Sequence, residues 1–312
     1  MAFRILIDES MEAAVQRVAR EQIDKAMGEI KDSELDRHKV VHQVRKRCKK
    51  IRGLLRLVRP RFKNNFDREN AWYRDAARPL SYVRDAQSIF ETLDKLMEHF
   101  QDQIDREAFA SVRQQLTDRR RQVTEDKGSL DKQLEEFLER MDEGRDRVAA
   151  WQLDKKGFKA VQGGLVKTYA RGRTAMKQAY RDPSTEHFHV WRKRVKYHWY
   201  HMRLVQPVWP GPIKARCNEA DALSDLLGDD HDLSVLRETL LEGDLDFGGQ
   251  ETIQALIGLI SQRQIELRAK AKQLGDTLYT EPPKHFIKRL RSYWKAWQSD
   301  EETELQTIHV PE

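Results

Sequence analysis

Basic side chains recur along one face of a predicted helix in the first part of the chain. His42, Arg45, Lys49, Arg52 and Arg56 follow one another at alternating steps of three and four residues, which places them on one stripe of an α-helix. Nine Lys or Arg residues and no acid lie between positions 41 and 61. Like charges at this spacing repel one another, so an anion is expected opposite the stripe. Guanidinium forks and lysine charges suit phosphate oxygens.

A second segment repeats this basic pattern. Residues 188–207 align with residues 41–60 at a constant offset of 147, and the same offset aligns residues 91–93 with 238–240. The offset predicts two copies of one helical unit, packed about a pseudo-twofold axis. Nine positions of the two segments are identical, namely His42 and His189, Arg45 and Arg192, Lys46 and Lys193, Arg47 and Arg194, Lys49 and Lys196, Arg56 and Arg203, Leu57 and Leu204, Val58 and Val205, and Pro60 and Pro207.

The two basic stripes predict a central basic groove or pore. Each stripe adjoins an apolar stripe, so each helix buries one face and presents its cations on the next. The span from residue 42 to residue 56 measures about 21 Å at the helical rise, which suits an extended polyanion better than a single phosphate. Two alternatives stay open: the stripes are solvated faces, or their cations pair with internal carboxylates. The candidate carboxylates are Asp85, Glu91, Asp232 and Glu238.

The apolar positions along the whole chain predict an all-α fold, an internally duplicated helical bundle. They recur at intervals of three and four residues, and only 15 Gly and 9 Pro interrupt them over 312 residues. We expect helices over about 10–30, from 35 to a stop at Pro60, after residue 66 and over 80–100. One domain is predicted over 1–298, with repeat one over about 5–100, a long helical hairpin over about 101–155 turning near Gly128, repeat two over about 156–275, a C-terminal helix over about 284–298 and a flexible tail over 299–312.

Composition and charge favour a cytoplasmic protein with an anionic partner. The chain carries 57 Lys and Arg against 51 Asp and Glu, a net charge of +6, and its sequence pI is about 9.1. No apolar run approaches the about 18 residues needed to cross a membrane, and acids stand where a signal peptide needs an apolar stretch. Two cysteines, Cys48 and Cys217, cannot form a disulfide framework. We therefore predict neither membrane insertion nor secretion.

Competing chemistries find less support in the sequence. His38 and His42 have the spacing of helical metal ligands, but Thr185 replaces His38 in the second copy and no acid or cysteine completes the set. Gly163 and Gly164 lack the Lys-Ser/Thr that a P-loop needs. We predict no bound metal, no cofactor and no enzymatic activity, with a metal-dependent phosphoryl-transfer enzyme as one alternative. The other alternative is a nucleic-acid-binding helical protein, because basic stripes neutralise nucleic-acid backbones and aromatic residues stack bases.

The histidines of the two stripes are expected to take part in anion binding. His42 and His189 would donate hydrogen bonds to phosphate, or to a carboxylate that orients them, and would become charged as the pH falls toward about 6.5. This predicts tighter polyanion binding at about pH 6 than at about pH 8. His198 and His201, which adjoin Trp199 and Tyr200, are interpreted as hydrogen-bonded groups of a helix interface.

These segments resemble the CHAD family of histidine-bearing α-helical domains over about residues 5–297. The resemblance lies in the run His42 to Arg52, in the run His189 to Lys196, and in segments 80–85, 169–173 and 227–232. It implies a helical, internally duplicated domain that binds inorganic polyphosphate along a basic central channel, often at polyphosphate granules. The implied binding positions are His42, Arg45, Lys46, Lys49, Arg52, Arg56, His189, Arg192, Lys193, Lys196 and Arg203, with weaker assignments at Arg20, Arg84, Arg173 and Lys177.

The sequence departs from the family pattern at three positions. Lysines stand at Lys49 and Lys50 where an arginine pair is common, and Trp199 occupies an arginine position. The second half is then predicted to hold phosphate less tightly, or Trp199 to be a packing residue. No acidic motif of a triphosphate-hydrolysing domain appears in the sequence, so we expect a stand-alone binding module.

Overall fold

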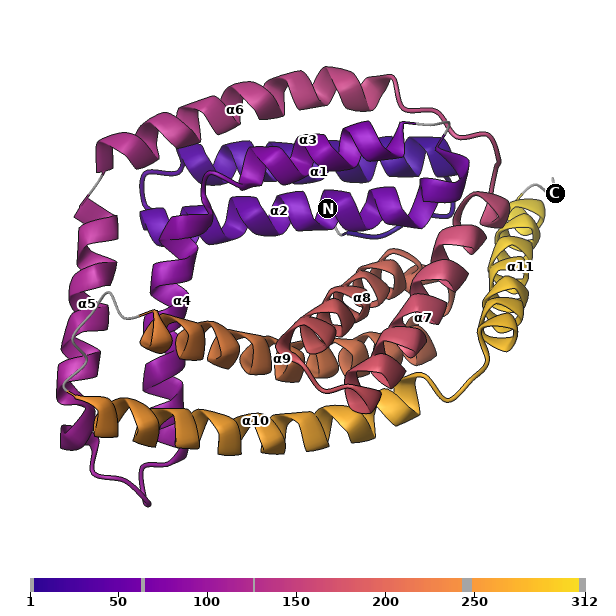
Figure 1. Cartoon of the computed structure of the whole chain (residues 1–312). Helices are drawn as coiled ribbons and strands as arrows, with labels where there is room; N and C mark the ends of the chain where they lie inside the picture. Colours follow the sequence, from indigo (N-terminus) through magenta and orange to yellow (C-terminus); the bar gives the residue numbers. More distant parts are fainter. Residues whose placement is uncertain (1–2, 63–64, 126, 243–248, 309–312) are drawn as a thin grey trace.

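The described part of the chain folds into helices joined by short connections. The computed structural model describes residues 3–62, 65–125, 127–242 and 249–308 (Figure 1), except the side chains of 83–85, 123–125, 127 and 300–308. No strand occurs within these residues, which confirms the predicted all-α class. The helices are α1 (Met11–Lys31), α2 (Arg37–Val58), η1 (Arg59–Arg61), α3 (Phe66–Ala77), α4 (Ser81–His99), η2 (Arg106–Phe109), α5 (Ala110–Glu125), α6 (Lys127–Ala149), α7 (Phe158–Arg181), α8 (Thr185–Leu204), η3 (Gln206–Val208), α9 (Pro210–Leu241), α10 (Gln250–Leu278) and α11 (Pro283–Ile308), of which η1, η2 and η3 are 3₁₀-helices.

Helix α2, which carries the first basic stripe, begins and ends close to the predicted positions. Asp36 caps its first turn, because its side chain accepts hydrogen bonds from the amides of His38 and Lys39 at 2.9 and 3.3 Å. At the other end Pro60 lies in the 3₁₀ turn η1, where no amide is available to continue the α-helix. The predicted apolar stripe between these ends is buried, and it comprises Val44, Cys48, Ile51, Leu55 and Val58.

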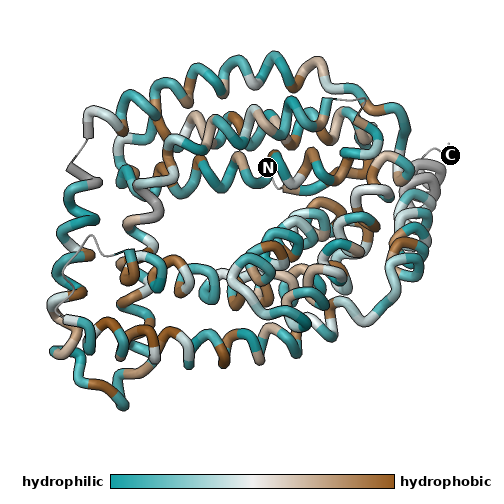
Figure 2. Tube along the Cα trace, viewed as in Figure 1, coloured by the Kyte–Doolittle hydropathy of each residue, from teal (hydrophilic) through white to brown (hydrophobic). Residues whose placement is uncertain are grey.

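The helices form two groups that meet along α2 and α4. In the first group α1 packs on α2, α2 on α3, and α6 on α1; in the second α7 packs on α8, α8 on α9, and α9 on α10 (Figure 1). Helix α2 contacts both α7 and α8, while α4 leaves the first group to pack on α9. Hydrophobic and hydrophilic residues alternate along most helices (Figure 2), as expected for helices that bury one face and expose the other.

Glycines allow α2 to approach α7 and α8 closely. A Cβ atom on Gly164 of α7 would lie 1.9 Å from the Leu57 carbonyl oxygen of α2, and one on Gly53 would lie 2.9 Å from the Tyr200 ring of α8. The Gly53 carbonyl also accepts a hydrogen bond from His201 Nε2 at 3.1 Å, as predicted for an interface histidine. The two basic helices are therefore held in direct contact, with the backbone of α2 against α8.

The predicted helical hairpin over 101–155 is wrong. Helices α5 and α6 run along different parts of the molecule (Figure 1), α5 against α4 and α6 against α1. The physical reason is that their apolar residues join different cores. Leu116 of α5 lies in a smaller core with Leu93 and Leu236, whereas Leu134 and Phe137 of α6 lie in the main core. Residue 126, between the two helices in the sequence, lies outside the described residues.

The last helix, α11, is longer than the sequence predicts. The buried side chains Phe286, Leu290 and Trp294 place its first half against the main core, where it packs on α7. Its backbone continues as helix to Ile308, past the predicted end at 298, and residues 309–312 lie outside the described part. Among the described helices, none combines the length and apolar character that a membrane crossing requires.

Candidate anion-binding site

Residues from both predicted basic segments line one cavity. The cavity measures about 600 Å³ and lies among α2, α4, α8 and α9. Five cationic side chains and three carboxylates contribute to its lining, together with three histidines. The predicted site residues in this lining are His42, Arg45, Lys46 and Lys49 from α2 and His189, Arg192 and Lys196 from α8.

Carboxylates of α9 face the basic residues of α8. Lys196 Nζ lies 3.5 Å from Asp221 Oδ1, and Arg192 Nη1 lies 4.0 Å from Asp232 Oδ1. Burial lowers the pKa of Lys196 and raises the pKa of Asp225, the third carboxylate. The alternative of internal pairing therefore holds in part, because Asp232, one of the four candidate acids, pairs with the stripe cation Arg192.

On the α2 side, a backbone contact fixes the orientation of one arginine. Arg45 Nη1 donates to the Ala77 carbonyl at 2.8 Å, which ties α2 to the end of α3 and holds the side chain at the cavity. His42 and Lys49 are exposed along the same stripe. Lys50, the next residue in the chain, turns away from the cavity: it is buried with its Nζ 5.5 Å from the Phe3 ring, and burial lowers its pKa to about 7.

Two histidines stack at the cavity wall and are uncharged near neutral pH. The rings of His189 and His231 lie 4.2 Å apart between centroids. Burial, followed by the neighbouring charges, lowers the pKa of His189 to about 4 and that of His231 to about 3. The predicted charging of His189 near pH 6.5 is therefore wrong, because desolvation and adjacent cations disfavour the imidazolium.

Trp199 packs against basic side chains at a position where the CHAD resemblance implies an arginine. It is buried, and its ring lies 4.0 Å from Lys196 Nζ and 5.0 Å from the Arg203 guanidinium carbon. Cations over an indole face are stabilised by its quadrupole. Trp199 therefore supports Lys196 at the cavity and keeps Arg203, which is not in the lining, beside Phe3 and the indole.

The remaining residues of the first stripe turn away from this cavity. Arg52 and Arg56 both donate to Asn70 Oδ1, at 3.2 and 2.7 Å, and Arg56 lines a second cavity with Arg194. A stripe with steps of three and four drifts around a straight helix by about 20° per heptad. Over the length of α2 this drift, together with the crossing of α8 at Gly53, separates the two ends of the stripe.

The other predicted positions lie outside the cavity lining. Lys193 and Arg20 are exposed, and Arg173 and Lys177 line a separate cavity of about 380 Å³ between α7 and α10. The Arg84 side chain lies outside the described residues. These positions are therefore not brought together with His42 and His189.

Sequence reasoning named only Asp232 among the residues of α9 that line the cavity, and it missed the other polar ones. Asp221, Asp225 and His231 line it, together with Asp232. Their spacing follows one helical face, so the periodicity that revealed the basic stripes could also have revealed this acidic one. Among the described residues, no three His, Cys, Asp or Glu side chains gather closely enough to hold a metal ion.

The fold and its paired basic helices define a helical domain with one cavity shared between two similar segments. The chain belongs to the CHAD family, since the CHAD domain matches residues 14–241. PptA from Streptomyces chartreusis has a similar fold, with a TM-score of 0.62 and 12% identity over 88% of this chain and 100% of that chain. The CHAD domain from the plant Ricinus communis has a TM-score of 0.62 and 15% identity over 91% of this chain and 96% of that chain. No curated protein sequence matches this chain.

Proposed function

We propose that this protein binds inorganic polyphosphate, without catalysis, in the cavity of about 600 Å³ between α2 and α8. The observation that carries the proposal is the gathering of seven predicted binding residues, from segments 147 positions apart in the sequence, around one cavity. Polyphosphate is the ligand that the CHAD resemblance implies. Its charges repeat at short intervals along a chain without side groups, so a lining of several cations from two helices suits it.

We further infer that the domain consists of two copies of one unit around this basic groove. A shift of 147 carries α1 onto residues 158–178 and α2 onto residues 184–205. The observed helices at those places are α7 (Phe158–Arg181) and α8 (Thr185–Leu204). The agreement of both helices with one offset supports a pseudo-twofold relation, and it gives His42 and His189 equivalent places at the cavity.

The burial of the aromatic residues favours polyphosphate over nucleic acid. Trp191 and Tyr200 are buried at 0% and 2% exposure, and Trp199 is 8% exposed. Trp209 is 46% exposed, but it packs edge-on against Tyr293 with 4.5 Å between ring centroids. Stacking of bases requires accessible aromatic faces beside the basic track. Trp199 and Tyr200 line the cavity but expose little of their rings, and we interpret all four aromatic residues as packing residues.

A competition experiment tests the choice between the two polyanions. The full-length protein is captured on immobilised long-chain polyphosphate and eluted with free polyphosphate, single-stranded DNA of equal charge, or orthophosphate at fixed salt. We expect long-chain polyphosphate to compete at concentrations far below those of DNA. A reversed order would transfer the proposal to nucleic acid, and hydrolysis of the bound chain with added Mg²⁺ would contradict a purely binding role.

We also propose that the protein is cytoplasmic and that binding places it at polyphosphate granules. This location follows from the same ligand and needs no further site. Fluorescence imaging of the tagged protein in cells with and without accumulated polyphosphate tests it. Foci that form equally in both conditions would contradict granule association.

A further inference from the structure

A second cavity lies at the far end of α2, where this helix meets α7 and α8. It measures about 220 Å³, little more than a third of the first cavity, and the two linings share no residue. Five cationic side chains line it, and no carboxylate of the described residues does so. These cations are Arg56 on α2, Arg59 in η1, Lys167 and Arg171 on α7, and Arg194 on α8.

The arginines of the second cavity are held in place although they repel one another. Arg56 stacks on the Tyr197 ring at 4.1 Å, donates to Asn70 Oδ1 at 2.7 Å, and has its pKa lowered to about 10, first by burial and then by neighbouring arginines. Burial, followed by the charge of Arg171, also lowers the pKa of Arg194. Arg59 stacks on Phe66 and has one acid nearby, exposed Asp67 at 3.8 Å, which is not in the lining.

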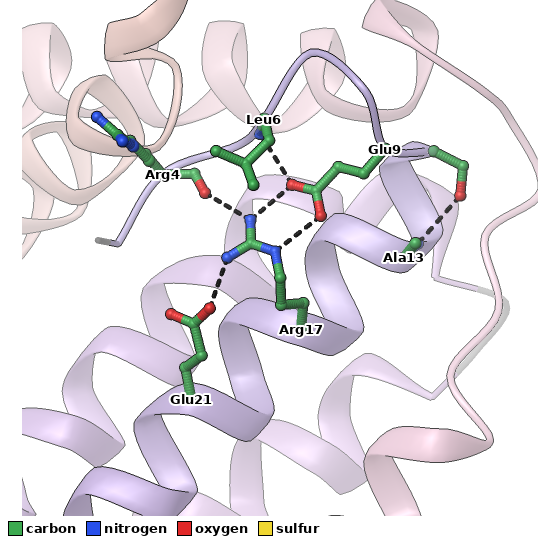
Figure 3. Close-up of polar contacts among 7 residues, drawn as sticks. Arg4, Leu6, Glu9, Ala13, Arg17 and Glu21 are labelled. Carbon is green, nitrogen blue, oxygen red and sulfur yellow. Dashed lines mark hydrogen bonds and ion pairs between the residues drawn. The ribbon is translucent and has the colours of Figure 1, made fainter. Parts of the chain in front are cut away.

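The corresponding place in the first half of the sequence is neutralised by carboxylates. Arg47, which is 147 positions before Arg194, is hydrogen-bonded and ion-paired to Glu29 of α1. Arg17 of α1 is bonded to both Glu9 and Glu21 (Figure 3), with Arg17 Nη1 2.8 Å from Glu21 Oε1.

The second half replaces Glu21 and Glu29, and also Asp24, an acid of α1 that pairs with Arg145 of α6. The positions 147 residues after Glu21, Asp24 and Glu29 are Thr168, Arg171 and Met176. Thr168 and Arg171 line the second cavity, so two acidic positions of α1 become a hydroxyl and a cation at the cavity wall. One half thus satisfies its arginines internally, whereas the other leaves a set of cations around an open cavity.

We infer that the second cavity is an anion site for a single phosphoryl or pyrophosphoryl group. Several guanidinium forks and one lysine surround a small volume, which is the arrangement that binds compact phosphate oxygens bidentately. An anion there relieves the repulsion among Arg56, Arg171 and Arg194. The group is either a free small phosphate or the terminal group of a longer phosphate chain. The inference does not depend on polyphosphate binding in the first cavity, because no lining residue is shared.

The test uses pyrophosphate binding by the full chain, followed by calorimetry at fixed salt. The variant K167E/R171D reverses two exposed cations of the lining, so it is expected to fold normally. The matched control K31E/K155D makes the same change of charge at exposed lysines that line none of the described cavities. The variant R45A/R192A removes two cations of the first cavity.

We expect the natural protein to bind one pyrophosphate, K167E/R171D to bind it at least about tenfold more weakly, and both K31E/K155D and R45A/R192A to stay within about twofold. Absence of pyrophosphate binding by the natural protein would overturn the inference. The inference would also be overturned if R45A/R192A lost pyrophosphate binding while K167E/R171D kept it, because the small anion would then lie in the first cavity. Weakened binding of long-chain polyphosphate by K167E/R171D would support the site and assign it to the end of a chain.

Discussion

At the scale of single residues, the first cavity combines cations with carboxylates that compete with any bound anion. Asp221 and Asp232 lie 3.5 and 4.0 Å from Lys196 and Arg192, distances at which they already partly satisfy these cations. A phosphate chain must displace or share these contacts. If the proposed function holds, we expect these carboxylates to reduce the affinity for polyphosphate while they offset the charge of the cations in the cavity.

Removing one carboxylate should strengthen polyphosphate binding. Asp225 lines the cavity, and burial raises its pKa, so the surrounding protein stabilises its charge poorly. We expect Asp225→Asn to raise affinity by up to about fivefold, since charge pairs near a protein surface are worth about 0.2–1 kcal/mol. Asp276→Asn on α10, outside the first cavity, is the control for net charge. An equal gain in both variants, or a loss in Asp225→Asn, would contradict a local effect.

Three histidines that are wholly or partly buried should make the fold less stable in acid. The pKa values of His189, His231 and His201 are lowered to about 4, about 3 and about 3, mainly by burial. An unfolded histidine takes up a proton near pH 6.5, whereas these folded ones do so only near pH 3–4, so stability is fully present above about pH 6.5 and is lost as the pH falls toward 4.

Thermal unfolding between about pH 7 and about pH 4.5 measures this loss. We expect Tm to fall steadily over that range, and His201→Gln, which keeps a donor for the Gly53 carbonyl, to flatten the decline. A Tm that rises on acidification would show that these histidines are not buried in the neutral form. The same pKa values predict that His189 adds no positive charge to the empty site between pH 8 and pH 6.

Residue types and spacing predicted several residues that line the first cavity, but they did not predict the second cavity. The stripe positions His42, Arg45 and Lys49 line the cavity as their helical spacing indicates. Arg56 and Arg194 instead line the second cavity, because the packing of α8 and α7 against α2 places them together. The packing of other helices on α2 decides which cavity each end of the stripe faces. No local sequence pattern encodes that packing.

At the scale of helices, the close contact between α2 and α7 sets the position of the basic stripe. Gly164 leaves no room for a side chain, because a Cβ atom there would lie 1.9 Å from the Leu57 carbonyl oxygen. We expect Gly164→Ala to separate the two helices and to lower the free energy of unfolding by at least about 2 kcal/mol, as overpacking of a tight contact does.

Gly28 provides the matched control for this prediction. It lies in α1, and a Cβ atom added there would have no neighbouring atom within 4 Å, so Gly28→Ala should stabilise the protein by about 0.5–1 kcal/mol through helix propensity. Chemical denaturation of both variants provides the measurement. If Gly164→Ala is as stable as the natural protein, then α2 and α7 are not held by this backbone contact.

Helix positions were more predictable than helix partners. The predicted start near residue 35 and the predicted stop at Pro60 lie close to the ends of α2, and the predicted C-terminal helix over about 284–298 falls within α11. The separation of α5 from α6 was not foreseen, because each helix alone is amphipathic and the choice of core depends on distant segments such as α4 and α9.

At the scale of the whole molecule, a nearly balanced charge hides an uneven distribution. The net charge of +6 is the difference between 57 cations and 51 acids. The acids of α1 pair with Arg17 and Arg47, and those of α9 pair with Lys196 and Arg192, whereas the lining of the second cavity contains none among the described residues. Anion binding is therefore expected at particular cavities rather than over the whole basic surface.

The double variant R45A/R192A shows whether α2 and α8 together bind polyphosphate. Both side chains line the first cavity, one from each helix, and neither is buried in the core. The control R113A/R145A removes two arginines of exposed ion pairs elsewhere. With folding verified by circular dichroism, we expect R45A/R192A to lose long-chain polyphosphate binding by at least about a hundredfold and R113A/R145A to retain it. Unchanged binding by a folded R45A/R192A would contradict the proposed function.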